Sequence, residues 1–220
     1  MTATGTTGVK GSPRGRRAAR PSGDDRESAI LATAERLLEE QPFNEISIDD
    51  LARGAGISRP TFYFYFPSKD AVLLTLVDRV VAEADTSAGD VLERIAEDPA
   101  ARWREAIGRF YETFRSHRAV ALAIGQVRGT NAEVRALWGS ILERWVSSTE
   151  QAIRAERRRG AAPDGLPARD LAIALISMNE QVVYATLASD GPAVAESDVV
   201  DVLLDVWLRS IYLTTTPQRA

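Results

Sequence analysis

The 220-residue chain contains no cysteine and only one histidine, His117. The lack of cysteine excludes disulfides, thiolate metal sites and cysteine nucleophiles. A single histidine cannot anchor a multi-histidine metal site. The sequence also lacks a Gly-rich phosphate loop and an obvious nucleophile–base pair. We therefore expect no catalytic residue, no bound metal and no cofactor. An enzyme that uses an apolar pocket is the least favoured class of function.

Apolar targeting segments are also missing. The first thirty residues have no apolar core of a signal peptide, and no apolar run approaches the length of a membrane span. These absences predict a soluble, cytoplasmic protein with no membrane partner. Hydrophobic residues still make up 45% of the chain, which is ample for a core. We find no strand pattern and no internal repeat, so the sequence predicts an all-α protein of about nine helices.

The net charge of -4 is unevenly distributed. Residues 1–22 contain five basic residues and no acidic one, which leaves -9 for the rest of the chain. This segment is rich in Thr, Gly, Ser and Pro and has no hydrophobic period, which is typical of disorder. We predict a disordered basic arm over residues 1–22 whose Arg14, Arg16 and Arg17 contact phosphates or a minor groove. A solvated leader that orders only on binding is compatible with this role.

An aromatic-rich stretch over residues 57–69 predicts a short helix with two different faces. Ser58 can cap its first turn, and Pro60 lies early enough to cost no helical hydrogen bond. At 100° per residue, Phe62 and Phe66 share one face, which leaves residues such as Tyr63 on the others. One face belongs to the core, and the other is available for function.

A second short helix precedes this stretch. Ser47 and Asp50 have the spacing of a capping box, and Gly56 can supply the turn between the two helices. Small Ala52 and this glycine allow a close helix crossing, as a helix-turn-helix requires. In that motif the second helix enters the major groove of DNA. The predicted DNA-contacting residues of the two helices are Ser47, Ser58, Arg59, Pro60, Thr61, Tyr63, Tyr65 and Lys69.

Within this set, Arg59, Thr61 and Tyr63 are the expected groove contacts. The others are expected on or near the DNA backbone. The angle of Tyr65 also suits the core side, beside Phe62, so its role stays open.

These motifs resemble the TetR family of DNA-binding transcriptional repressors. The resemblance lies in the capping Ser47, in the Ala55-Gly56 turn and in the runs 61–63 and 66–69. Residues 14–17 and 20–26 are more narrowly similar to a mycobacterial branch that represses a monooxygenase gene. The resemblance is strongest over residues 13–80. It implies a three-helix helix-turn-helix head over residues 23–67 and a C-terminal ligand-binding and dimerisation domain over residues 68–220.

Apolar periodicity and caps give the order of helices. We expect helices over about 24–41, 47–55, 58–66, 68–97, 99–115, 119–128, 131–160, 168–189 and 195–214. The last two have no clean polar face, so each must bury two sides. A homodimer formed through the last two helices explains this pattern, and the family resemblance implies the same.

Two helices of the C-terminal part carry aromatic stripes at the spacing i, i+4, i+7, i+11. Such stripes usually form core. Asn179 places an amide among apolar residues, and a buried amide needs a partner on the protein or on a guest. The family resemblance implies a pocket for an elongated, mainly apolar, uncharged ligand. The candidate lining residues are Trp103, Ile107, Phe110, Phe114, Trp138, Leu142, Trp145, Thr149, Met178, Asn179, Val182 and Trp207.

The sequence thus predicts a repressor that binds a near-palindromic operator on double-stranded DNA as a homodimer and is released by a small hydrophobic ligand. The resemblance implies a monooxygenase gene as its target. Two alternatives stay open: a ligand-responsive activator, and a helical ligand-binding dimer without a DNA function. Salt-dependent DNA binding distinguishes the last of these from the others.

Overall fold

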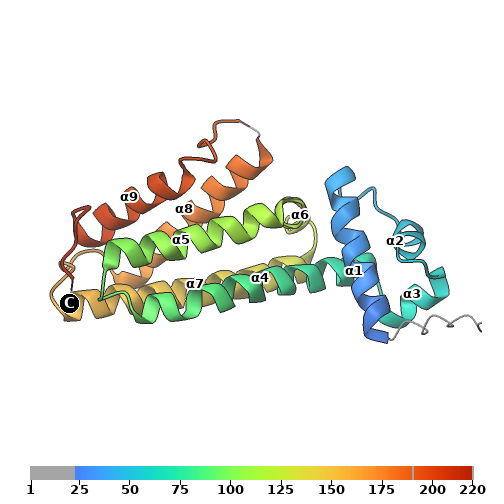
Figure 1. Ribbon diagram of the computed structural model, residues 1–220, viewed down its shortest axis with the longest axis horizontal. Coiled ribbons are helices and arrows are strands. Elements are labelled where there is room, and N and C mark those ends of the chain that lie inside the picture. The colour runs from blue at the N-terminus through green and yellow to red at the C-terminus, as the bar shows by residue number, and fades with distance from the viewer. Residues whose placement is uncertain (1–22, 190, 220) are drawn as a thin grey trace, which may run out of the picture.

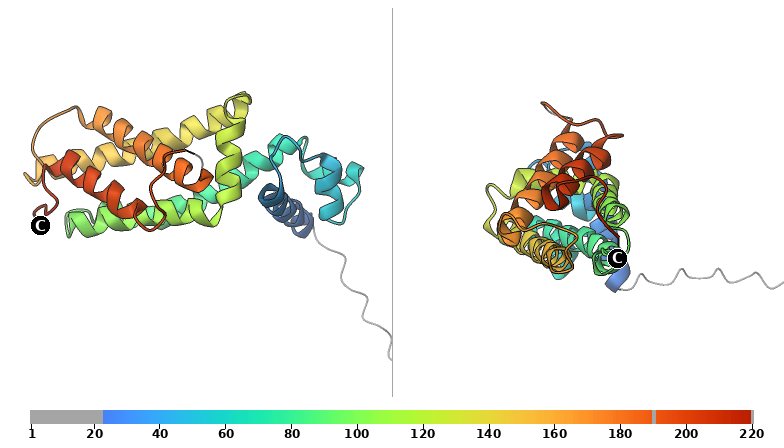
Figure 2. Two further views of the ribbon diagram at one scale, coloured as in Figure 1. Left: turned by 90° about the horizontal axis from the view of Figure 1, so that it is seen from above. Right: turned by 90° about the vertical axis from the view of Figure 1, so that its left-hand side faces the viewer.

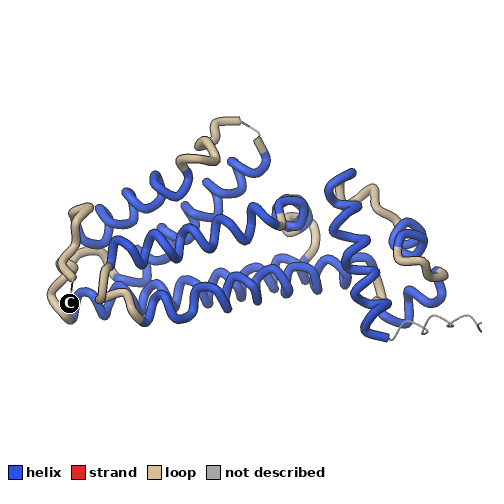
Figure 3. The backbone as a smooth tube through the Cα atoms, viewed as in Figure 1, coloured by secondary structure: helices blue, strands red, loops and turns tan. Residues whose placement is uncertain are grey.

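The fold is described from a computed structural model that covers residues 23–189 and 191–219, without the side chains of residues 86–90. The predicted arm, with Arg14, Arg16 and Arg17, lies outside the described residues. Within them the chain forms nine α-helices and no strand (Figures 1 and 3), which confirms the all-α prediction. The helices are α1 Gly23–Glu40, α2 Ile48–Gly54, α3 Arg59–Tyr65, α4 Lys69–Glu93, α5 Pro99–Ser116, α6 Arg118–Val127, α7 Ala132–Arg158, α8 Ala168–Ala188 and α9 Val199–Tyr212.

The helices form two regions, which we call the head (α1–α3) and the body (α4–α9). The head lies at one end of an elongated bundle, and α4 runs from it along the body (Figure 1). In the body α4 packs on α5 and α7, while α8 lies against α7 and α9 against α5. The short α6 lies at the end of the body nearest the head and contacts α1 (Figure 2).

Polar caps set the starts of the helices as the sequence predicted. The Ser47 hydroxyl accepts from the Asp50 amide, and the Asp50 carboxylate accepts from the Ser47 amide, which completes the capping box. Ser58, Ser68 and Asn131 accept amide hydrogen bonds at the starts of α3, α4 and α7. Each cap satisfies donors that a helix start would otherwise leave unpaired.

Two helices end earlier or begin later than predicted. We expected α4 to reach Glu97, but it ends at Glu93 because the next residues form tighter turns, with Arg94 donating to Val91 and Ile95 to Leu92. We expected α9 to begin near residue 195, but it starts at Val199. Apolar periodicity continues through such turns, so it overestimates helix length.

Helix α8 corrects one expectation about apolar segments. It is long and apolar enough to cross a membrane by length and composition, although no contiguous apolar run had indicated this. This is weak evidence for a membrane span, because the core helix of a soluble protein passes the same test. Leu171, Leu175 and Val183 are buried in the body, while Ile173 is exposed. The helix is therefore apolar on both an inner and an outer face.

His117 connects the head to the body. It lies at the junction of α5 and α6, with Nδ1 2.5 Å from Glu35 of α1 and Nε2 3.3 Å from Glu83 of α4. A neutral imidazole has one N–H donor, so only the doubly protonated ring donates to both carboxylates. Burial alone would lower the His117 pKa, but the two carboxylates outweigh it, and the pKa is raised above its ordinary value.

We therefore expect the substitution His117→Gln to cost stability in a pH-dependent way. Because the pKa is raised in the folded state, the stabilisation is complete below the unfolded value of about 6.5 and is lost as pH rises through the folded value. Urea unfolding of both proteins between about pH 6 and pH 9 measures the effect. The difference in unfolding free energy should shrink with rising pH. A difference that is constant with pH would contradict the ionic bridge.

Candidate DNA-binding surface and ligand cavity

The two helices α2 and α3 form a helix-turn-helix around a small apolar centre. Leu51, Ala52 and Phe62 are buried between the helices. Gly56 has a φ of 66°, a left-handed conformation that favours glycine in the turn. A side chain at Gly54 would collide with Thr33, so glycine there lets α2 approach α1 closely. The sequence placed the turn correctly.

The outer face of α3 carries aromatic and cationic groups. The side chain of Tyr63 is 46% exposed and that of Phe64 is 83% exposed. Arg59 pairs with Asp49 of α2 at 2.7 Å and donates to the Tyr63 hydroxyl at 3.4 Å. Within the head, therefore, the predicted groove residues Arg59 and Tyr63 lie together on one exposed surface. Pro60, in the first turn of α3, is exposed as well.

The predicted hydroxyl contacts are partly used within the head. The Ser47 hydroxyl lies 2.5 Å from the Asp50 carboxylate, and the hydroxyls of Ser58 and Thr61 lie 2.8 Å apart. All of these hydrogen bonds are solvent-exposed, so the same oxygens still face the surface. Tyr65 is half-buried and packs against the core, which supports the alternative interpretation of this residue.

Lys69, a predicted contact of the DNA backbone, is engaged within the protein. Its ammonium donates to the backbone carbonyls of Phe43, Asn44 and Ile46 at 3.0, 3.1 and 2.9 Å, and it lies 4.8 Å from the centre of the Phe43 ring. All three N–H donors are thus used within the protein. Lys69 thus holds the loop between α1 and α2 against the start of α4, and a phosphate contact would require it to leave these carbonyls.

Phe64 was not among the predicted site residues. It follows Phe62 by two positions, or 200° around a helix, so it lies opposite the buried face. An exposed phenylalanine on the helix that carries Arg59 and Tyr63 is a candidate for apolar contact with thymine methyl groups. The helical angle alone was a sufficient signal for this position.

The body contains an elongated cavity of about 720 Å³ between α4, α5, α7, α8 and α9. Its lining on α7 runs from Arg144 to Arg158, which corresponds to about 21 Å along a helix axis. The predicted residues that line it are Trp103, Ile107, Phe110, Trp145, Thr149, Asn179 and Trp207.

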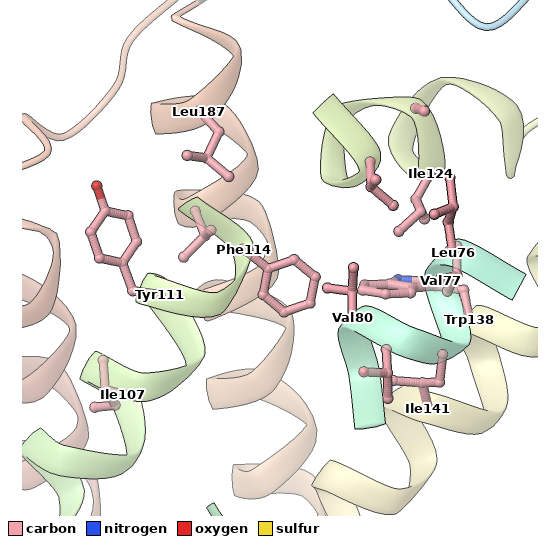
Figure 4. Packing of buried hydrophobic residues seen from close by; sticks show 14 of the residues in the cluster. Leu76, Val77, Val80, Ile107, Tyr111, Phe114, Ile124, Trp138, Ile141 and Leu187 are labelled. Carbon is pink, nitrogen blue, oxygen red and sulfur yellow. The ribbon is translucent and has the colours of Figure 1, made fainter. Parts of the chain in front are cut away.

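The other predicted residues divide into two groups. Phe114 and Trp138 line a second cavity of about 30 Å³, toward α6. Phe110 lines both cavities and so forms a wall between them. Figure 4 shows Phe114 reaching from α5 toward Trp138, and their rings meet edge to face at 6.0 Å. Leu142, Met178 and Val182 line neither cavity and pack half-buried against the core. Periodicity placed them on the inner side of their helices but could not predict their depth.

All four indole N–H groups of the chain donate to acceptors on the protein, at 2.8 to 3.0 Å. The cavity wall therefore presents indole rings to a guest and keeps their N–H groups occupied. The pairs are Trp103 with Tyr212, Trp138 with Glu180, Trp145 with Asp85 and Trp207 with Asn179.

Asn179 retains a donor for a guest. Its Oδ1 accepts from Trp207 at 2.9 Å, which fixes the orientation of the amide. Among the residues that the structure describes, no acceptor is hydrogen-bonded to its Nδ2. Because Asn179 lines the cavity and is buried, this NH₂ group suits a carbonyl or ether oxygen of a ligand.

One end of the cavity is polar, which the sequence analysis missed. Glu156 is fully buried there, accepts two hydrogen bonds from Arg159 at 2.7 and 2.6 Å, and accepts one from the Tyr212 hydroxyl at 2.9 Å. Burial, together with the Glu156 charge, raises the pKa of Tyr212 well above its usual range. Within this pair the carboxylate and guanidinium charges neutralise each other. Glu156 continues the α7 stripe seven residues after Thr149, and this signal could have indicated it.

A helix-turn-helix head joined to an all-helical body with an apolar cavity defines the class of one-component transcriptional regulators. The description "Bacterial regulatory proteins, tetR family" matches residues 30–76, and "Transcriptional regulator EthR, C-terminal domain" matches residues 103–213. The chain belongs to the TetR family of transcriptional regulators and is close to EthR.

Relatives cover almost the whole chain. The HTH-type transcriptional regulator EthR of Mycobacterium tuberculosis is 56% identical over 205 residues, which is 91% of this chain and 93% of that protein. EthR of Mycolicibacterium smegmatis is 52% identical over 202 residues, which is 92% of this chain and 93% of that protein.

Solved structures agree on the fold. A TetR-family regulator from Syntrophomonas wolfei has a TM-score of 0.72 at 17% identity, covering 88% of this chain and 98% of its own. A regulator from Saccharomonospora viridis, solved with choline, has a TM-score of 0.69 at 24% identity, covering 89% and 100%.

The position of Lys69 leads to a stability prediction. Replacing Lys69 with Met leaves three carbonyls without their donor and should lower the free energy of unfolding by about 2 kcal/mol. The exposed Arg53, replaced with Met as a control, should change it by less than about 0.5 kcal/mol. Urea unfolding measures both. If Lys69→Met instead leaves stability intact and lowers the salt dependence of DNA binding by about one phosphate, the phosphate role is correct.

Proposed function

We propose that this protein is a homodimeric repressor that binds a near-palindromic operator and is released when a small, mainly apolar ligand enters the body. The observation that carries this proposal is the pairing of an exposed aromatic recognition helix with a cavity of about 720 Å³ in one chain, joined by α4. The site residues and domain roles below are part of the proposal.

The head, residues 23–67, is the proposed DNA-binding domain. Arg59, Thr61, Tyr63 and Phe64 would meet the major groove from α3, while the hydroxyls of the two capping serines meet the backbone. The basic arm over residues 1–22 would add phosphate or minor-groove contacts. Asp49 holds Arg59 in the absence of DNA, so binding would exchange this carboxylate for a groove acceptor or a phosphate.

The outer faces of α8 and α9 are the proposed homodimer interface. Ile173 on α8 and Val202 and Val206 on α9 are exposed, although both helices also bury an apolar inner face. Pairing these faces across a two-fold axis would bury them in a four-helix interface. The same axis would present two recognition helices to the two half-sites of an operator.

The proposed ligand is elongated, uncharged and mostly apolar, with one hydrogen-bond acceptor. Its length follows from the extent of the cavity along α7, and its apolar character from the indole and phenyl walls. The acceptor would meet the NH₂ group of Asn179. The buried Glu156 is already paired with Arg159, so it offers no unpaired charge to a charged ligand.

Repression and release would be coupled equilibria. A ligand that favours a position of α4 unsuited to the operator lowers DNA affinity by the factor by which DNA lowers ligand affinity. The proposed target is a monooxygenase gene, as the family resemblance implies, and a DNA-binding role would put the protein in the cytoplasm. Activation of transcription remains the alternative, because the sign depends on the position of the operator.

The decisive experiment is a fluorescence-anisotropy titration onto DNA from the protein's own promoter region, across a salt series, with and without N-dodecylacetamide. Selective, salt-dependent binding that weakens with this probe supports both parts of the proposal. Selective binding that ignores every apolar probe would remove the ligand release. The absence of selective binding at any salt would remove the DNA function and favour a ligand-binding dimer.

Arg59 and Arg36 form a matched pair for testing the DNA surface. Both are about half exposed in the head, at 53% and 52%, and each pairs with one carboxylate. Arg59→Ala should weaken binding to promoter DNA by about tenfold or more, whereas Arg36→Ala should change it by less than about threefold. Neither should alter thermal unfolding appreciably. Equal effects of the two substitutions would argue against the proposed orientation of α3.

Asn179 should determine the preference for a ligand with an acceptor. Wild-type protein should bind N-dodecylacetamide about fivefold more tightly than tetradecane, and Asn179→Leu should lose this preference because the NH₂ donor is gone. Met178→Leu, beside the cavity but outside its lining, should keep the preference. Tryptophan-fluorescence titration measures both affinities. An unchanged preference in Asn179→Leu would place the acceptor elsewhere in the cavity.

A further inference from the structure

One of the four indole hydrogen bonds ends on the helix that carries the head. Three of them end on α8 or α9, which do not connect directly to the head. Trp145 of α7 instead donates to Asp85 of α4 at 2.9 Å. At its N-terminal end α4 begins at Lys69, only three residues after the recognition helix is capped by Phe66. This bond therefore connects a cavity wall to the continuous element between body and head.

Both residues of this bond line the cavity. The Asp85 carboxylate uses Oδ1 for the Trp145 indole and Oδ2 for Arg144, each at 2.9 Å, so both contacts tie α4 to α7. On its other side the Trp145 ring meets the Phe110 ring edge to face, with centres 5.2 Å apart. The indole is thus held between Phe110 of α5 and Asp85 of α4. A guest that occupies the part of the cavity beside Phe110 therefore lies against this indole.

We propose that Asp85 is a positioning residue that transmits occupancy of the cavity to α4. Displacement of the Trp145 indole moves or breaks its hydrogen bond to Asp85, and α4 then shifts relative to α7 and carries the head with it. The readout on DNA rests on the proposed function. The bond from Trp138 to Glu180 also joins an indole to a carboxylate, at 2.8 Å, but it ends on α8, so it provides a matched control.

Four variants distinguish loss of the hydrogen bond between Trp145 and Asp85 from general damage to the cavity. Asp85→Ala and Trp145→Phe remove the hydrogen bond, while Asp85→Asn retains an amide oxygen that accepts from the indole. Trp138→Phe removes the control bond. The affinity of each protein for promoter DNA is measured without probe and with saturating N-dodecylacetamide, and the affinity for the probe is measured separately.

The coupling factor, which is the ratio of the two DNA affinities, is the decisive quantity. It should be about tenfold or more in the wild type and fall below about twofold in Asp85→Ala and Trp145→Phe. Asp85→Asn and Trp138→Phe should stay within about threefold of the wild-type factor. If Asp85 only stabilised the fold, Asp85→Asn would not be expected to restore the coupling factor that Asp85→Ala loses. Full coupling in Trp145→Phe would overturn the proposal.

Hydrogen exchange of the α4 backbone amides over residues 69–85 distinguishes this inference from the proposed function. If the probe binds without changing wild-type DNA affinity, ligand release fails. The proposed transmission through Trp145 and Asp85 then stands only if the probe changes the exchange rates of the α4 amides in the wild type and in Trp138→Phe. In Asp85→Ala the probe should leave these rates unchanged. If the probe does not bind, the unliganded proteins decide. Asp85→Ala and Trp145→Phe should then exchange these amides at least about threefold faster than Trp138→Phe. Equal exchange rates in all three overturn the proposal.

Discussion

A buried indole N–H group needs an acceptor, and the body is organised around this requirement. Trp103, Trp145 and Trp207 place their rings against the large cavity and Trp138 places its ring against the small one, and each donates a hydrogen bond to the protein. Ring-to-ring packing positions the indoles as well, and the hydrogen bonds add a fixed orientation to each ring. Polar contacts at its walls thus help to shape the cavity of about 720 Å³.

The head satisfies its polar groups in a similar way, and this limits what it offers to DNA. Lys69 is fully used by three carbonyls, while Arg59 is held by Asp49 through an exposed pair. An exposed ion pair contributes little to stability, so Arg59 can exchange partners at small cost. A lysine that bonds three carbonyls cannot do so without leaving them unpaired. Arg59 is thus available to a new partner such as DNA, whereas Lys69, ten residues later, is not.

The sequence predicted the features that depend on local spacing. Caps such as Ser47 and Asn131 fixed the starts of helices, and the stripe from Trp138 to Thr149 identified the inner side of α7. The family resemblance supplied the two-part architecture. What the spacing could not provide was the identity of distant partners: Asp85 lies sixty residues from Trp145. Nor could it tell that Leu142 packs beside the cavity while Trp145 lines it, because periodicity gives the direction of a side chain but not its depth.

The connection between head and body has a mechanical consequence. The head is joined to the body covalently, where α3 passes into α4, and non-covalently, where α1 packs on α4 and α6 and His117 contacts Glu35 of α1. A rotation of the head relative to the body must therefore carry α4 with it or separate α1 from α6. His117 resists the second movement most strongly when both of its ring nitrogens carry a proton. The protonation of one imidazole thus changes how closely the head follows the body.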